Sequence, residues 1–186
     1  LGERLTGGFN PGEARKLLAE AGFPEGRGFP VIQLLLDDNQ NHKAVAEAIT
    51  GMWQEHLGIQ SKIIEQEYRV YLSTMFAKDY QVARVGWIAD YNDPMTFLDM
   101  WVTGNDNNLA DWENAEYDRL IGAAAGEVDR AVRNGLMFEA ERILMDQLPV
   151  VPVYYYTNPY LERDTVKGVI HPSFAIFAEF KWAYVE

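Results

Sequence analysis

The first half of the chain alternates between short apolar runs and segments with apolar residues at helical spacing. A short, continuous apolar run over residues 29–36 is typical of a buried strand, and further strands are predicted over residues 59–67 and 81–87. Residues 41–57 place apolar side chains on one face of a helix, and a shorter helix is predicted over 69–77. The order strand, helix, strand, helix, strand predicts an α/β layer.

Helices are also predicted before and after this segment of the sequence. A helix over residues 10–21 begins with Asn10 as N-cap and Pro11 at its first position. Two further helices are predicted over 115–125 and 129–147, after a polar loop at 104–108 that we interpret as a solvated turn rather than a calcium loop. Short strands are predicted over residues 150–156, 166–170 and 180–184.

Composition narrows the possible partners and compartments. The 186 residues carry a net charge of −12 and include no cysteine, which excludes disulfides and thiolate zinc sites and argues against nucleic acid or anionic membrane as partners. No apolar run approaches the ~18 residues of a membrane span. The chain starts at Leu1 without a signal-peptide apolar region, so we expect it to be a piece of a longer protein.

The third predicted strand and the residues directly after it carry the most distinctive chemistry. Ligands of α/β sheets bind beyond the carboxyl ends of strands. Here a strand-like run contains Arg84 and ends in Trp87, which the pattern predicts to be exposed, and Asp90. A cation, an aromatic plate and an anion in close succession suit a ligand with a charge at each end and side chains between them, such as a peptide.

Each of these charged residues also has a purely structural interpretation. A guanidinium in an apolar strand needs a partner, and for Arg84 an internal acid and a ligand carboxylate are equally good candidates. Asp90 is a candidate to cap a helix after Pro94 or to pair with a ligand ammonium. For Asp93 we favour the role of a turn former beside Pro94.

Catalytic and metal-binding patterns are weak. Asp90 and Asp93 would be the carboxylates of a hydrolase, but no other feature supports one. His42, His56 and His171 lack the spacing of a zinc site. The sequence also lacks a nucleophile elbow and a phosphate-binding loop. We therefore predict a protein that is not an enzyme and that holds no metal or cofactor.

Three stretches resemble a known family. Residues 83–94 (ARVGWIADYNDP) resemble the central motif of the oligopeptide-binding proteins of bacterial ABC importers, which are family 5 extracellular solute-binding proteins. Residues 151–156 (VPVYYY) resemble a second marker of that family. The helix and stop over residues 10–22 resemble a third, so the resemblance covers nearly the whole chain.

The resemblance implies the C-terminal lobe of a two-lobed, type II periplasmic-binding-protein-like fold, truncated at its start. Residues 1–156 would form that lobe, and residues 157–186 would be strands returning to the N-terminal lobe, without their sheet partners in this piece. The implied function is to bind oligopeptides in the interlobe cleft of an ABC importer, in the periplasm or anchored outside the membrane, for delivery to the permease. Relatives of this fold carry dipeptides, nickel chelates, opines or sugars, which remain alternatives.

The resemblance also assigns roles by position. Asp90 would hold the α-ammonium of the peptide, and the backbone of Gly86 and Ile88 would pair with it as an added strand. Arg84 and His42 would meet carboxylate ends of longer ligands. Aromatic pocket walls are implied at Trp87 and Tyr156, and at Tyr68, where relatives have tryptophan. Met75 stands where relatives have a second arginine for the carboxyl end, so the ligand length is left open.

Overall fold

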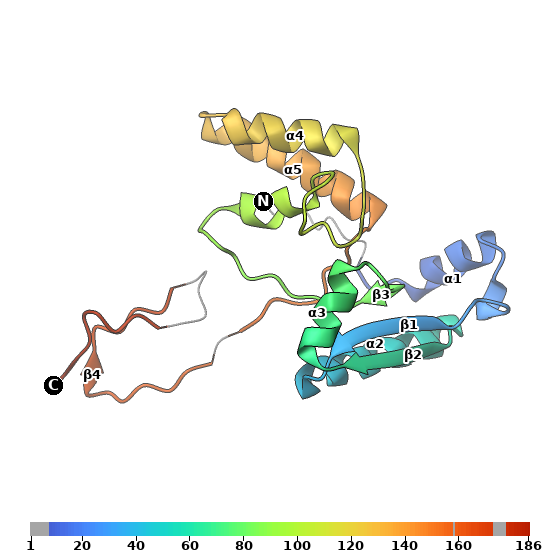
Figure 1. Cartoon of the computed structure of the whole chain (residues 1–186), viewed down its shortest axis with the longest axis horizontal. Coiled ribbons are helices and arrows are strands. Elements are labelled where there is room, and N and C mark those ends of the chain that lie inside the picture. Colours follow the sequence, from blue (N-terminus) through green and yellow to red (C-terminus); the bar gives the residue numbers. More distant parts are fainter. Residues whose placement is uncertain (1–7, 158, 173–177) are drawn as a thin grey trace. The chain divides into compact units, whose positions relative to one another are not determined.

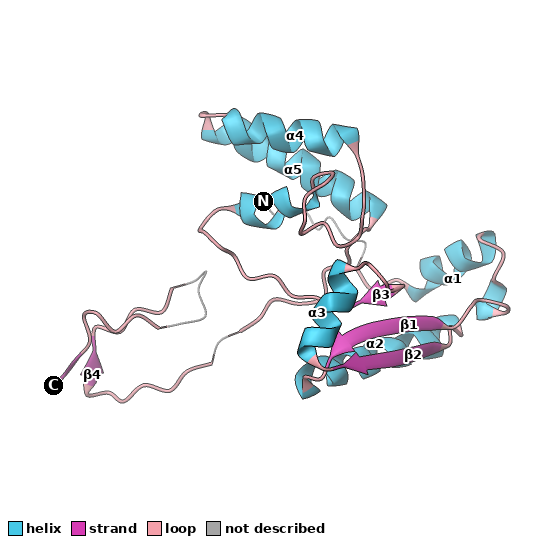
Figure 2. Ribbon diagram, viewed as in Figure 1, coloured by secondary structure: helices cyan, strands magenta, loops and turns pink. Residues whose placement is uncertain are grey.

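The computed structural model describes residues 8–157, 159–172 and 178–186, which belong to two compact units. The first unit comprises the chain up to Gly86 together with Leu109–Asp111, and the second comprises Trp87–Asn108 and the chain from Trp112 onward. The predicted division at residue 156 concerns the lobes of a longer protein and stays a prediction. Figures 1 and 2 show the elements of both units.

The first unit is built on a parallel sheet, which confirms the predicted α/β layer. β1 lies in the middle, with β2 on one side and β3 on the other. Helices α2 and α3 cover opposite faces of this sheet (Figure 1). The elements of this unit are α1 (Pro11–Glu20), the 3₁₀ turn η1 (Pro24–Gly26), β1 (Ile32–Asp37), α2 (Gln40–Leu57), β2 (Ser61–Gln66), α3 (Tyr68–Phe76) and β3 (Val82–Ala83).

Side chains on the two faces of β1 explain the position of each helix. Leu34 and Leu36 point to one face, where they pack with Ala46 of α2. Leu35 points to the other face, where it packs with Tyr71 and Met75 of α3. Because side chains of a strand alternate between faces, a continuous apolar run such as this one needs cover on both sides.

Local signals define where α2 begins and ends. The Asn39 side chain accepts hydrogen bonds from the backbone N–H groups of Asn41 and His42 and so caps the first turn. Gly58 ends the helix with a φ of 69°, in the left-handed region. A Cβ atom on Gly58 would lie 2.4 Å from the carbonyl oxygen of Glu25, so only glycine fits this close approach of two turns.

The third strand is much shorter than predicted. The apolar run over residues 81–87 predicts a strand, but only Val82 and Ala83 pair with β1. Arg84 donates one more backbone hydrogen bond to Leu35 at 2.9 Å, and the chain then leaves the sheet. Val85 is 43% exposed, so the second half of the run lacks the packing that would hold it in the sheet.

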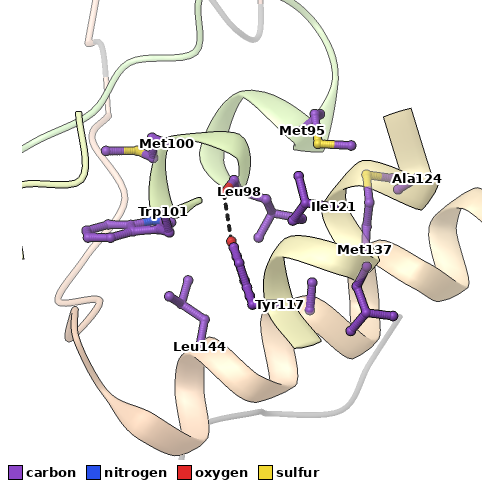
Figure 3. Packing of buried hydrophobic residues seen from close by; sticks show 11 residues of the cluster. Met95, Leu98, Met100, Trp101, Tyr117, Ile121, Ala124, Met137 and Leu144 are labelled. Carbon is purple, nitrogen blue, oxygen red and sulfur yellow. Dashed lines mark hydrogen bonds between the residues drawn. The ribbon is translucent and has the colours of Figure 1, made fainter. Parts of the chain in front are cut away.

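Most of the regular secondary structure in the described part of the second unit is helical. Its helices α4 and α5 lie side by side as a hairpin, and two 3₁₀ turns pack against them (Figures 1 and 3). Asn114 caps α4 and Asp129 caps α5, each by accepting two backbone N–H groups. The elements of this unit are η2 (Pro94–Phe97), η3 (Asp99–Trp101), α4 (Ala115–Gly126), α5 (Arg130–Gln147), β4 (Val166–Lys167) and β5 (Tyr184–Val185).

Tyr117 lies at the centre of the core of this unit (Figure 3). Its side chain is fully buried, and its hydroxyl donates to the carbonyl oxygen of Leu98 at 2.7 Å. Burial raises the pKa of Tyr117 well above its ordinary value, so the hydroxyl stays protonated and remains a donor. This hydrogen bond ties α4 to the chain between the two 3₁₀ turns.

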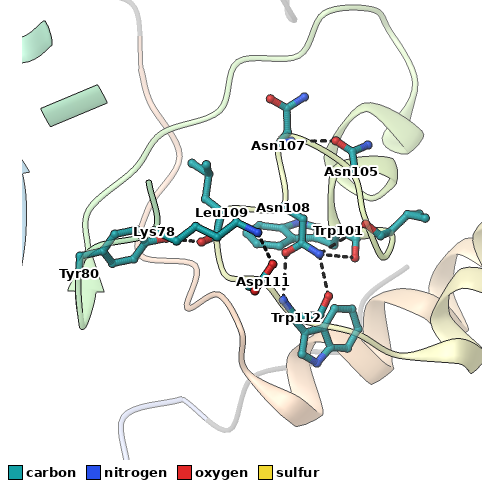
Figure 4. A network of polar contacts seen from close by, with 10 residues as sticks. Lys78, Tyr80, Trp101, Asn105, Asn107, Asn108, Leu109, Asp111 and Trp112 are labelled. Carbon is teal, nitrogen blue, oxygen red and sulfur yellow. Dashed lines mark hydrogen bonds and ion pairs between the residues drawn. The ribbon is translucent and has the colours of Figure 1, made fainter. Parts of the chain in front are cut away.

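The polar loop at residues 104–108 is exposed at Gly104, Asp106 and Asn107, as predicted, and is closed by a buried asparagine (Figure 4). Asn108 is 3% exposed. Its amide nitrogen donates to the carbonyl oxygens of Trp101, Val102 and Trp112, and its amide oxygen accepts from the N–H of Trp112 at 3.3 Å. The prediction of a turn is confirmed. The Asn108 side chain satisfies backbone groups that would otherwise be buried and unpaired.

One prediction for the tail needs correction. The strand predicted over residues 150–156 is wrong, since the described residues 151–157 have no regular structure. Tyr155 is 97% exposed, and no described strand supplies the hydrogen bonds that β-rich composition alone cannot provide. β4 and β5 pair with each other in antiparallel fashion. That residues 157–186 return to the sheet of an N-terminal lobe stays a prediction. None of the described helices has the length and hydropathy to cross a membrane.

Candidate functional site

The chain between β3 and η2 has a bare backbone. Within the described residues, the N–H and C=O groups of residues 85–89 form no hydrogen bonds. Gly86 is exposed, and the Ile88 side chain is 49% exposed. Backbone polar groups require partners, so this stretch presents a row of donors and acceptors to solvent or to a ligand.

His42 and Asp37 form a close pair at the carboxyl end of β1. Their Nδ1 and Oδ1 atoms lie 2.5 Å apart, and the side chains are 15% and 13% exposed. The turn between them is fixed by the Asn39 cap of α2. Because Asp37 accepts a hydrogen bond from Nδ1, the other ring nitrogen of His42 is the one turned away from this carboxylate.

Tyr71 and Arg84 meet next to this pair. The Tyr71 hydroxyl donates to the carbonyl oxygen of Arg84 at 2.6 Å. Burial and, to a smaller extent, the Asp37 carboxylate raise the pKa of Tyr71, which the Arg84 guanidinium opposes, and the net result is a pKa of about 12. Arg84 is half-buried rather than enclosed in a strand as predicted. Whether it serves an internal acid or a ligand carboxylate stays a prediction.

Tyr68 and Met75 lie on α3 with opposite exposure. Tyr68 is 53% exposed and stacks on Tyr71, with ring centroids 6.3 Å apart. It has the exposure expected of a pocket wall. Met75 is 2% exposed and belongs to the core beneath the sheet, so this position provides no polar group to a ligand.

In the second unit, Asp90 and Asp93 have distinct environments. Asp90 is exposed, its N–H donates to the Thr96 hydroxyl at 3.1 Å, and its carboxylate has no hydrogen-bond or ion-pair partner in the described chain. Asp93 binds Arg133 through both carboxylate oxygens and accepts the N–H of Met95. Its role as a turn former is confirmed. The hydrogen bonds from Arg133 lower the pKa of Asp93, which makes it a poor general acid.

Trp87 and Tyr156 differ in burial. Trp87 was predicted to be exposed, but it is half-buried and packs against the α4–α5 core. Its Nε1 atom is buried and has no hydrogen-bond partner among the described residues. Tyr156 is 51% exposed and meets the Tyr154 ring edge to face, with centroids 5.2 Å apart. Trp87 therefore presents part of its ring, and Tyr156 about half of its surface.

Residues 3–109, more than half of the chain, match the model of the bacterial extracellular solute-binding proteins, family 5, middle region. The chain belongs to this family. Among curated family 5 proteins of Bacillus subtilis, it is 35% identical to oligopeptide-binding protein OppA over 84% of its length and 36% identical to dipeptide-binding protein DppE over 97%. These matches cover 29% and 34% of the two proteins, so the chain spans about a third of its relatives.

A solved structure is similar over most of this chain. Haemophilus influenzae OppA in complex with the peptide RPPGFSPFR is similar with a TM-score of 0.76 and 37% identity. The match covers 85% of this chain and 31% of that one. The α/β architecture described above is thus that of a partial lobe of a family 5 solute-binding protein.

The predicted site residues of this family 5 chain are divided between the units. The first unit holds His42, Tyr68, Arg84 and Gly86, and the second holds Trp87, Ile88, Asp90 and Tyr156. Sequence reasoning missed Asp37, Tyr71 and Thr96, which contact these residues, and Arg133, which contacts Asp93 in the same loop as Asp90. For Asp37 a signal existed, because it precedes His42 by five residues at a strand end. No such signal pointed to Arg133.

Proposed function

We propose that this chain is the peptide-contacting part of a solute-binding component of an ABC importer. The observation that carries the proposal is the backbone of residues 85–89, which forms no hydrogen bonds within the described chain, followed by the exposed carboxylate of Asp90, which has no partner there either. A peptide that adds as a strand requires free N–H and C=O groups, and its α-ammonium requires an anion where that strand begins.

In this proposal the backbone of Gly86 and Ile88 pairs with the peptide main chain and Asp90 binds its ammonium group. The exposed rings of Tyr68 and Tyr156 and the accessible part of Trp87 line side-chain pockets. Main-chain hydrogen bonds are independent of the peptide sequence, and wet aromatic pockets tolerate many side chains. His42 and Arg84 are assigned to the carboxylate ends of longer peptides.

The remaining parts of the proposal concern the whole protein. Two lobes would close on the ligand by a hinge motion, and the permease would recognise the closed form. Energy for transport would come from the transporter ATPase. The protein would act in the periplasm or anchored outside the membrane, in keeping with the extracellular family to which the chain belongs.

A dipeptide is the second candidate ligand, because the match to dipeptide-binding protein DppE covers 97% of this chain. A buried Met75 provides no second cation for a distant carboxylate, so the structure carries no preference for long peptides. A hydrolase is the weaker alternative. It would need both Asp90 and Asp93, and Arg133 occupies both carboxylate oxygens of Asp93.

Calorimetric titration of the full-length protein with di- to pentapeptides, each free and N-acetylated, tests the proposal. We expect N-acetylation, and separately Asp90→Asn, to weaken binding about tenfold to a hundredfold, the range for a hydrogen bond to a charged group. Chromatography of the same peptides after incubation tests turnover, which we expect to be nil. Equal affinity for free and acetylated peptides would refute the ammonium role of Asp90.

A further inference from the structure

The loop that carries Asp90 is held by one buried hydroxyl. The N–H of Asp90 donates to Thr96 Oγ1 at 3.1 Å, and the Thr96 side chain is 2% exposed. The N–H of Thr96 in turn donates to the carbonyl oxygen of Asp93 at 3.2 Å. The chain from Asp90 to Thr96 is thereby closed into a ring of hydrogen bonds within the second unit.

Arg133 fastens this ring to the helical hairpin. Its Nη1 and Nη2 atoms donate to the two oxygens of Asp93 at 2.7 and 2.9 Å, in the planar fork that only arginine provides. Its Nε atom donates to the carbonyl oxygen of Ala124 in the last turn of α4, at 3.2 Å. One side chain from the first turn of α5 therefore joins both helices to the Asp90 loop.

We propose that Thr96, Asp93 and Arg133 are positioning residues that fix the Asp90 carboxylate for the ammonium group of a ligand. The inference rests on the proposed function. Asp90 has no other hydrogen bond in the described chain, so its location depends on this ring. A carboxylate that is held in place before binding loses less conformational freedom when the ligand arrives, and that saving appears as affinity for the amine.

The test compares two dissociation constants for each variant of the full-length protein. Calorimetry measures binding of the tightest ligand among tri-, tetra- and penta-alanine and of its N-acetylated form, and the ratio of the two constants is the amine preference. Thr96→Val keeps the shape of the side chain and removes the hydroxyl. Thr96→Ser keeps the hydroxyl and is its matched control.

A second pair of variants tests the other end of the ring. Arg133→Lys keeps the charge but loses the fork, and Arg142→Gln removes an exposed arginine on the same helix that pairs only with nearby Glu139 among the described residues. Thermal unfolding of each variant shows whether it folds. Because both constants are measured on the same preparation, a smaller folded fraction leaves their ratio unchanged.

We expect Thr96→Val and Arg133→Lys to reduce the amine preference about fivefold, the effect of one ordinary hydrogen bond, with affinity for the acetylated peptide unchanged. Thr96→Ser and Arg142→Gln should keep the wild-type ratio. If Asp90→Asn abolishes the preference while Thr96→Val and Arg133→Lys keep it, the positioning role is wrong and the proposed function stands. If the wild type shows no amine preference, or binds none of these peptides, the proposed function fails and this inference fails with it.

Discussion

The first unit positions its predicted site residues through the backbone of a sheet, whereas the second unit does so through side chains. In the first, the parallel ladder from Ile32–Ser61 to Asp37–Gln66 fixes where β1 ends and where His42 follows. In the second, Arg133 and Thr96 hold the Asp90 loop by hydrogen bonds. The backbone hydrogen bonds of a sheet survive most side-chain substitutions, whereas a side-chain hydrogen bond is lost when its residue is replaced. The position of the site residues in the second unit should therefore be more sensitive to single substitutions.

The hydrophobic cores of the two units also differ, in how many clusters of buried residues they contain. The sheet has a small cluster on each face, one around Leu36 and one around Leu35. Among its described residues, the second unit has one cluster of eleven buried residues, with Tyr117 at its centre (Figure 3). One cluster that supports a whole unit concentrates its stability, so a cavity there should affect every element packed against it.

The largest effect is expected for Tyr117→Ala. Loss of a fully buried aromatic side chain and of its hydrogen bond to Leu98 should cost about 3–5 kcal/mol of unfolding free energy. Hydrogen exchange followed by mass spectrometry should show lost protection in α4 and α5, with protection kept in β1 and β2.

Tyr117→Phe is the control for this cavity. It keeps the ring and removes one of the two hydrogen bonds to the Leu98 carbonyl, which still accepts the N–H of Trp101, and should cost only about 0.5–1.5 kcal/mol. If Tyr117→Ala removes protection equally from α4 and from β1, the two units share one cooperative core and the contrast between them is wrong.

Asn108→Ala should have the next largest effect. The variant leaves the carbonyl oxygen and the N–H of Trp112 without their partner inside the protein (Figure 4), at a cost of about 2–3 kcal/mol. Urea unfolding measures this cost. Asn107→Ala is the matched control, because that neighbour is exposed and should change stability by less than ~0.5 kcal/mol. Equal midpoints for both variants would show that the side-chain network does not stabilise this unit.

The sequence predicted helices well because their signals are local. The Asn10 cap and Pro11 set the start of α1, and Gly58 sets the end of α2, each within a residue or two of the prediction. Strands were harder. The runs over 81–87 and 150–156 have strand-like composition, yet a strand exists only where a neighbour provides hydrogen bonds, and that depends on parts of the chain far away in sequence.

The candidate site shows the same limit. The role of Asp93 in a turn was predicted because Asn92 and Pro94 are its immediate neighbours. Its ion pair with Arg133 joins residues 40 positions apart, and no local pattern indicates it. Trp87 was predicted to be exposed because it ends an apolar run, but packing against the α4–α5 core half-buries it. Local sequence patterns therefore indicate the residues proposed to contact a ligand. The residues that hold them in place come from distant parts of the chain and are found only in the folded structure.

The smallest effect concerns pH and tests whether the Arg133–Asp93 pair stabilises the second unit. Hydrogen bonds from Arg133 lower the pKa of Asp93 below its ordinary 3.8. The stabilisation is therefore complete above that ordinary value and is lost as the pH falls through the lower pKa of the folded state. Urea midpoints between pH 2 and 7 should fall less steeply in acid for Asp93→Asn than for the wild type, although the variant is less stable near neutrality.

Asp106→Asn is the control for this pH dependence, since it removes an exposed carboxylate that forms no ion pair within the described chain. Its midpoints should follow those of the wild type at every pH. The pair is partly exposed, at 23% for Arg133 and 30% for Asp93, so solvent weakens the interaction and the difference should be small. If Asp93→Asn and Asp106→Asn give the same acid slope, the fork orients the loop without stabilising the unit. The two roles of Arg133, to orient the Asp90 loop and to stabilise the second unit, would then be separated, because the amine preference of Arg133→Lys reports only on the orientation of the loop.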